Sequence, residues 1–166
     1  MINRFKLLNF LLPALTLTLA GPAWAGQSFQ ATVLRVSDGD TIVVRTDGFE
    51  DIKVRLYGID APERDQEGGA EATEALRVIL GQAVTITEMA VDRYGRTVAL
   101  VEHEGRVVNL DLVAQGLAWY YGQYCKAQPI CGEIKAAEAQ ARTAARRLWA
   151  GAPMAPWDWR RSKRTG

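Results

Sequence analysis

Five charged side chains between positions 40 and 96 have the chemistry needed to act on a phosphate ester: Asp40, Arg55, Asp60, Glu63 and Arg96. Two carboxylates can hold a hard cation such as calcium, which takes oxygen ligands from carboxylates, carbonyls and water. A third carboxylate can accept a proton from an attacking water. Each arginine can bind two phosphate oxygens in a fork and stays charged at any working pH.

The carboxylates occur in two short segments that we expect to adjoin. Asp40 and Asp60 can each supply a ligand to calcium, and Ala61 can add its backbone carbonyl. Pro62 stiffens the second segment, so that Glu63 projects at a fixed angle. Turn chemistry alone favours Asp-Gly and Asp-x-Pro sequences. It does not explain why Asp60 and Glu63 both follow the strand that carries an arginine.

The two arginines are informative as a pair. Taken singly, Arg55 is typical of a solvated charge on a strand edge, and Arg96 is typical of a hairpin loop. Together with a cation they could hold, from two sides, the charge that develops on phosphorus in a transition state.

Aromatic side chains near these groups could bind bases. Tyr94 lies between Arg93 and Arg96, and stacking of a base on its ring would not depend on sequence. Tyr124 belongs to a cluster with the run 119–121, which could either stack bases or pack against the barrel. We predict substrate contacts from Arg93, Tyr94 and Tyr124.

The elements that position these side chains are predicted to be mostly strands. A mainly β fold with some α, namely a five-stranded barrel of the OB type with about three packed helices, accommodates them. Asn109 is expected to cap the second helix, which Gly116 ends. The strands are expected at 30–36, 41–45, 52–57, 84–88 and 97–102, and the helices at 70–80, 109–116 and 131–149.

A hairpin turn at Asp47-Gly48 must bring the first aspartate and the first arginine together. A two-residue loop would place Asp40 opposite Arg55. A three-residue loop would place Thr41 opposite Arg55. Either register leaves the aspartate and the arginine at the same end of the hairpin.

The chain divides into three parts. Residues 1–25 have a basic start, an apolar stretch and an Ala-x-Ala site, which together predict a signal peptide. Residues 26–151 then form one domain, and 152–166 form a Pro- and Trp-rich, then basic, tail that wraps over the surface or frays. We therefore expect an exported monomer, periplasmic or secreted, with no stable membrane insertion after cleavage.

Charge and cysteine content narrow the function further. The 20 basic and 19 acidic residues nearly balance, and four of the basic residues lie in the last seven positions. A near-neutral body does not coat nucleic acid through bulk charge, so an anionic substrate must be met by a local site. Cys125 and Cys131 are the only cysteines, and in an exported chain they predict a disulfide.

Five segments in register resemble the staphylococcal nuclease (thermonuclease) family. The similarity extends from about Phe29 to Trp149. The matching segments are 38–41, Arg55-Leu56 with 59–63, 92–96, 108–118 and 137–142 with Leu148-Trp149. Ala61 stands where the founding type has threonine, the loop 64–69 is shorter, and the cysteine pair and the tail 156–160 are additions.

The resemblance implies an OB-fold barrel and a calcium-dependent nuclease acting on DNA and RNA. By that likeness Asp40, Asp60 and the Ala61 carbonyl bind Ca²⁺. Glu63 positions or deprotonates the attacking water, and Arg55 and Arg96 hold the scissile phosphate.

Two function hypotheses follow. The first is a calcium-dependent endonuclease that hydrolyses phosphodiester bonds of DNA or RNA with low sequence selectivity. The alternative is a nuclease-like barrel that binds single-stranded nucleic acid or a protein partner without cutting. The presence of all five charged residues favours the enzyme.

Overall fold

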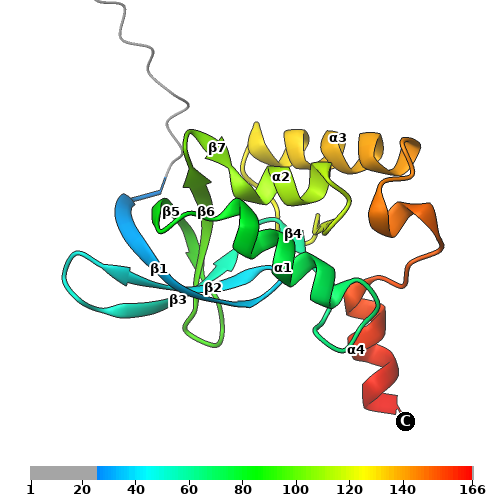
Figure 1. Ribbon diagram of the computed structural model, residues 1–166, viewed down its shortest axis with the longest axis horizontal. Helices are drawn as coiled ribbons and strands as arrows, with labels where there is room; N and C mark the ends of the chain where they lie inside the picture. The colour runs from blue at the N-terminus through cyan, green and yellow to red at the C-terminus, as the bar shows by residue number, and fades with distance from the viewer. Residues whose placement is uncertain (1–25, 166) are drawn as a thin grey trace, which may run out of the picture.

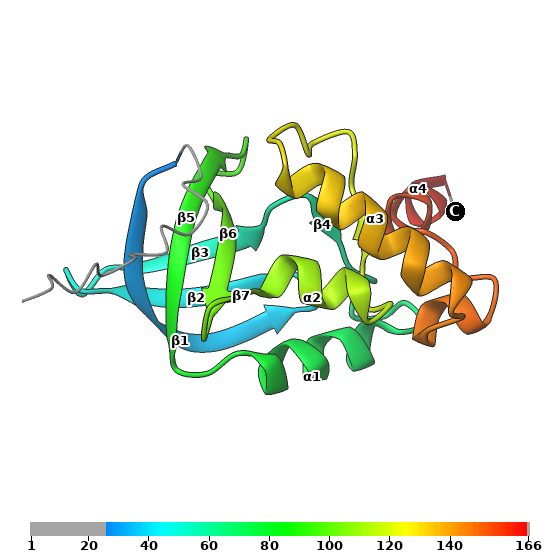
Figure 2. The ribbon, with the colours of Figure 1, turned by 90° about the horizontal axis from the view of Figure 1, so that it is seen from above.

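The fold is a closed barrel of five strands, seen in a computed structural model that describes residues 26–165 (Figures 1 and 2). Neighbouring strands follow the order β3-β2-β1-β5-β6, and a parallel pairing of β3 with β6 closes the barrel. This confirms the predicted mainly β architecture of the OB type. The predicted signal peptide, 1–25, lies outside the described residues. The barrel strands are β1 (Ser28–Asp38), β2 (Thr41–Thr46), β3 (Asp51–Leu56), β5 (Ala83–Val91) and β6 (Thr97–His103).

Short strands and helices complete the domain. Strand β4 (Ile59–Asp60) pairs with β8 (Trp119–Tyr120), and β7 (Arg106–Val107) extends the edge of β6. Helices α1, α2 and α3 lie together on one side of the barrel, and α4 lies at the lower right of the view (Figure 1). The helices are α1 (Gly69–Ile79), α2 (Val108–Ala114), α3 (Ile130–Thr143), the 3₁₀ turn η1 (Arg147–Ala150) and α4 (Pro156–Thr165). No helix within residues 26–165 is both long and apolar enough to cross a membrane.

The β2–β3 hairpin has the register of the three-residue loop. Thr41 pairs with Arg55, and the backbone N–H of Thr46 donates to the carbonyl of Glu50. Residues 47–49 therefore form the loop, with Phe49 in the left-handed region at φ 61°. The hydrophobic pattern decides this register, because a one-residue shift would turn buried Val54 outward.

The core lies between the barrel and the three helices that cover it. Apolar side chains at alternate positions of the strands meet the apolar stripes of the helices, and each such large side chain contributes roughly 1.5–3 kcal/mol on burial. Fully buried members include Ile42, Val44, Val54, Leu56, Leu76, Ile86, Leu100, Leu112 and Ile134.

Two helical predictions were wrong in detail. The helix expected at 131–149 ends at Thr143, because Ala145 turns into the left-handed region (φ 47°) and the Arg146 N–H returns to the carbonyl of Ala141. This is a Schellman-type end with alanine in place of the usual glycine. The buried face of α3 extends through Ile134, Ala137 and Ala141, whereas Ala145 is exposed.

Asn109 does not cap α2 as predicted. Its side chain is fully buried and bridges three backbone groups. Its Oδ1 accepts the N–H of Val101 at 3.0 Å, and its Nδ2 donates to the carbonyls of Tyr57 and Ala99 at 2.9 and 3.1 Å. Pairing of these buried backbone groups ties the end of β3 to β6. The prediction that Gly116 ends this helix is confirmed: it has φ 73°, two residues beyond Ala114.

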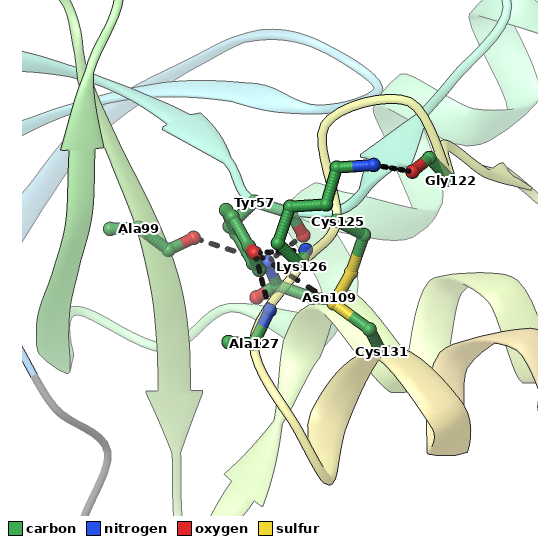
Figure 3. The surroundings of a disulfide bond; sticks show 8 residues. All are labelled: Tyr57, Ala99, Asn109, Gly122, Cys125, Lys126, Ala127 and Cys131. Atoms are coloured by element: carbon green, nitrogen blue, oxygen red, sulfur yellow. Dashed lines mark hydrogen bonds between the residues drawn. A yellow bond between two sulfur atoms is a disulfide. The ribbon is translucent and has the colours of Figure 1, made fainter.

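The predicted disulfide between Cys125 and Cys131 is present and joins the loop after β8 to the start of α3 (Figure 3). The Tyr57 hydroxyl accepts the N–H groups of Lys126 and Ala127, at 2.7 and 3.0 Å, beside the same loop. The disulfide loop is thereby fixed to the residue that directly follows β3.

Candidate active site

Asp40 is positioned by a tight turn between β1 and β2. The carboxylate of Asp38 accepts the N–H of Asp40 at 3.2 Å, and the Asp40 carbonyl accepts the N–H of Leu56 at 2.9 Å. Glycine is required at position 39, because a Cβ there would lie 2.8 Å from the Cβ atoms of both Ala61 and Ala72. The turn therefore packs directly against the segment that carries the second aspartate.

Arg55 lies between the two aspartates. Its Nη2 atom is 2.9 Å from Oδ2 of Asp40 and 2.8 Å from Oδ1 of Asp60. Its Nη1 donates to the carbonyl of Leu56 at 3.0 Å. Because both carboxylates contact the same nitrogen atom, they lie side by side. Both are buried, which is uncommon for acidic side chains unless they are paired.

Burial dominates the electrostatics of Asp40. Loss of solvent raises the pKa of Asp40 to about 7, against the opposing charge of Arg55, and the negative charges of Asp38 and Asp60 act in the same direction as burial. The backbone N–H of Ala61 donates to Oδ2 of Asp40 at 2.7 Å. A cation beside these carboxylates would find oxygen atoms that are already oriented and poorly hydrated.

Glu63 lies on the loop that follows β4, after buried Pro62. The backbone N–H of Glu63 donates to Oε1 of Gln66 at 3.1 Å, and the backbone N–H of Gln66 donates to the carbonyl of Glu63 at 2.9 Å. The carboxylate itself is 38% exposed, unlike the two aspartates. A fixed backbone and an accessible carboxylate suit a group that handles a water molecule.

Arg96 is held on the loop between β5 and β6. Its Nε atom is 2.7 Å from Oδ2 of Asp92, and the other oxygen of Asp92 accepts its backbone N–H at 3.0 Å. Burial opposes ionisation, but hydrogen bonds from Arg96 and Tyr94 lower the pKa of Asp92 below its usual value. The guanidiniums of Arg93 and Arg96 lie over the Tyr94 ring, 4.9 and 5.6 Å from its centroid.

All nine side chains singled out in the sequence line one cleft of about 630 Å³. The fold thus brings residues from the turn at 38–40, β3, β4 and the loop at 92–96 to one surface. The nine are Asp40, Arg55, Asp60, Ala61, Glu63, Arg93, Tyr94, Arg96 and Tyr124.

The aromatic cluster divides into packing and exposed members. Trp119 is buried and meets Trp149 edge-on, with ring centroids 5.1 Å apart. Tyr124 is 59% exposed and Tyr94 is 69% exposed, and both line the cleft. Two exposed rings on a polar cleft are suitable stacking partners for bases.

Sequence reasoning missed a further arginine in the cleft. Arg160, on α4, donates three hydrogen bonds to Asp60 and Glu63, at 2.6, 2.7 and 3.3 Å. The sequence predicts a tail that wraps over the surface or frays, whereas 156–165 is helical and its Arg160 reaches the site. The spacing of basic residues in the tail was the available signal, but it did not show which of them faces the carboxylates.

The donor set fits a hard divalent cation. Three carboxylates, Asp40, Asp60 and Glu63, supply oxygen atoms close to one another around Arg55 and Arg160. Within 26–165 no three or more His, Cys, Asp and Glu side chains form a ready-made metal cage. A cation would therefore depend on two carboxylates, a backbone carbonyl and water, which is a ligand set that calcium accepts.

Comparisons with known proteins agree with this geometry. The family model described as staphylococcal nuclease homologue matches residues 53–151. An endonuclease of Haemophilus influenzae is 37% identical over 166 residues, covering 99% of this chain and 89% of that protein. The micrococcal nuclease of Shigella flexneri is 38% identical over 163 residues, covering 91% and 90%.

An endonuclease of Escherichia coli is 40% identical over 134 residues, covering 79% of this chain and 84% of the relative. The family match and the relatives together span the barrel, the cleft and the helices that cover them. The chain therefore belongs to the staphylococcal nuclease family and is a hydrolase of the nuclease class.

Proposed function

We propose that this protein is a calcium-dependent nuclease that hydrolyses phosphodiester bonds of DNA or RNA with low sequence selectivity. The observation that carries the proposal is the pairing of two buried aspartates through one arginine nitrogen, beside an accessible glutamate. Such a constellation is costly to bury, and a packing role does not require it. Family membership adds that nucleases of this kind generally depend on a metal ion.

Asp40, Asp60 and the carbonyl of Ala61 are the groups that would hold the cation. When bound, a divalent ion supplies a Lewis acid that neutralises charge on a phosphoryl oxygen. Calcium is the proposed ion because all the available donors are hard oxygen atoms.

The other side chains act on water and phosphate. Glu63 orients an attacking water through its exposed carboxylate and accepts its proton. Arg55 and Arg96, which line the same cleft, bind the scissile phosphate and stabilise its added charge. Tyr94, Tyr124 and Arg93 contact the neighbouring nucleotides by stacking and charge, which explains low sequence selectivity.

Chelation and a matched glutamate pair test this proposal. Hydrolysis of single-stranded DNA should require added calcium and stop with a chelator. Glu63→Gln should lower the rate by roughly 100-fold or more, because the water loses its proton acceptor. Glu67→Gln is the matched control, since Glu67 is exposed on the same loop and does not line the cleft.

Two results would contradict the proposal. Cleavage that persists in chelator would contradict the proposed dependence on a metal ion. An unchanged rate in Glu63→Gln would contradict the proposed role of Glu63 in handling the attacking water. The alternative of a non-cutting binding module predicts retention of a single strand in a gel-shift assay with no products at any calcium concentration.

The proposed location is a separate matter. We propose an exported protein, periplasmic or secreted, from the leader-like pattern of 1–25 and the Cys125–Cys131 disulfide. Fractionation of cells followed by amino-terminal sequencing would test it, and a chain that begins at Met1 in the cytoplasm would contradict it.

A further inference from the structure

Arg160 contacts the two carboxylates on which the proposed chemistry depends. Its Nη2 is 2.7 Å from Oδ2 of Asp60, and its Nη1 is 3.3 Å from Oδ1 of the same carboxylate. Nη1 is also 2.6 Å from Oε1 of Glu63. These partners lie about one hundred positions away in the sequence, so the contact is a property of the tertiary structure.

These contacts place a guanidinium nitrogen against both oxygens of Asp60. Its Oδ1 also receives Nη2 of Arg55 at 2.8 Å, so a guanidinium nitrogen lies against each carboxylate oxygen. A metal ligand must direct a lone pair at the cation, and a guanidinium at the same oxygen repels that cation. Arg160 and a divalent cation therefore compete for Asp60, and the arginine also holds the glutamate that would handle the water.

From this geometry we propose that α4 is an autoinhibitory segment, in which Arg160 occupies the cation-binding carboxylates until a divalent cation displaces it. The inference rests on the proposed metal dependence. It adds that cation binding is opposed by the protein's own C-terminal helix and is coupled to release of that helix.

The remaining contacts of α4 suit a helix that can detach from the cleft. Trp157 stacks on Tyr121, with ring centroids 5.4 Å apart and planes within 3°. Trp159 and Lys163 both reach Asp65, in exposed hydrogen bonds. Exposed ion pairs typically contribute little to stability, so the arginine is the strongest anchor of the helix.

The segment that connects α4 to the rest of the domain also suits a helix that can detach. Residues 151–155 form no helix or strand between η1 and α4, and α4 follows this segment at the end of the chain (Figure 1), with Arg160 and Arg164 lining the cleft. Gln66 donates to the carbonyl of Met154 at 2.6 Å, which fixes the start of the segment near the loop of Glu63. Pro156 is the one buried residue among the described residues of α4, and Trp157, Trp159 and Arg160 are half-buried, so the helix rests on the surface of the domain rather than in its core.

The experiment compares calcium binding by the intact chain and by two glutamine variants on the same helix. Isothermal titration with calcium should give about tenfold tighter binding for Arg160→Gln, the effect expected for loss of charge-assisted hydrogen bonds at the ligand. Arg161→Gln is the matched control, because Arg161 is exposed and pairs only weakly with Asp158 at 3.6 Å. Its calcium affinity should equal that of the unchanged chain.

A second readout follows the helix directly. In the unchanged chain, calcium should accelerate amide hydrogen exchange across 156–165 and alter the fluorescence of Trp157 as it leaves Tyr121. In Arg160→Gln, the exchange of α4 should already be fast before calcium is added. Exchange that is unaffected by calcium would overturn the inference.

The outcomes separate this inference from the proposed function. Equal or weaker calcium binding by Arg160→Gln, with binding retained, would overturn autoinhibition alone and would indicate an arginine that assists the substrate. Absence of calcium binding in all three proteins would overturn both the inference and the metal assignment. Tighter binding in Arg160→Gln but not in Arg161→Gln would support the inference.

Discussion

The barrel edge and the C-terminal helix meet at the same carboxylates but are held in opposite ways. Asp40, Arg55 and Asp60 are buried or nearly so, and strand pairing and backbone hydrogen bonds fix each of them. Helix α4 reaches Asp60 and Glu63 through one arginine, which is 37% exposed. One region is thus preorganised by the fold, and the other is attached mainly by charge.

The two kinds of attachment suit two roles: a rigidly held region can form a catalytic site, and a weakly held region can control it. A catalytic site needs groups held rigidly, since their charges must already point at the reacting atoms. A controlling segment needs contacts weak enough to exchange with a ligand. The two regions of this molecule have these contrasting properties, so perturbing each should have different consequences for stability and for binding.

The largest effect should come from the centre of the barrel edge. Arg55→Met should lower the free energy of unfolding by about 3 kcal/mol, because it leaves buried Asp40 and Asp60 without the cation between them. Nuclease activity should fall with it. Urea denaturation monitored by circular dichroism measures the loss.

Lys53→Met on the same strand is the control, since Lys53 is exposed. It should change stability by no more than about 0.5 kcal/mol. Equal losses in the two variants would mean that the pairing of the aspartates through Arg55 does not hold this edge together.

An intermediate effect should follow removal of the disulfide. Replacing Cys125 and Cys131 together by alanine should cost roughly 2 kcal/mol, because the short loop regains freedom in the unfolded state. Thermal unfolding of this variant and of the oxidised parent gives the comparison. A loss far below this value would show that the Tyr57 hydroxyl contacts hold the loop unaided.

The smallest effect should come from the tail. A chain that ends at Gly151 lacks α4, and it should lose about 1 kcal/mol or less of unfolding free energy, because the Arg160 ion pairs and the Trp157–Tyr121 stack lie at a partly exposed surface. The same urea titration measures it. If the truncated chain unfolds as readily as Arg55→Met, α4 is part of the barrel's structure, and the contrast between the two regions fails.

Local sequence determined much of this protein. β-branched runs and turn residues specified the barrel strands and the hairpin at Asp47-Gly48, although two registers remained open until the structure paired Thr41 with Arg55. The types and order of Asp40, Asp60, Glu63 and Arg96 indicated a phosphate-handling cleft because each followed a strand or lay in a loop. These features depend on neighbouring residues, whose preferences act over a few positions.

Tertiary structure decided what depends on distant partners. Asn109 is typical of a helix cap by its local sequence. Its side chain instead forms hydrogen bonds with buried backbone groups of Tyr57, Ala99 and Val101. The alanine-rich helix ends at Thr143, although its composition would allow it to continue. Arg160 is one of several basic residues in the tail, and only the tertiary structure shows that it is the one that contacts Asp60 and Glu63. Packing and charge pairing across about a hundred residues leave no local pattern, so the sequence alone could not show them.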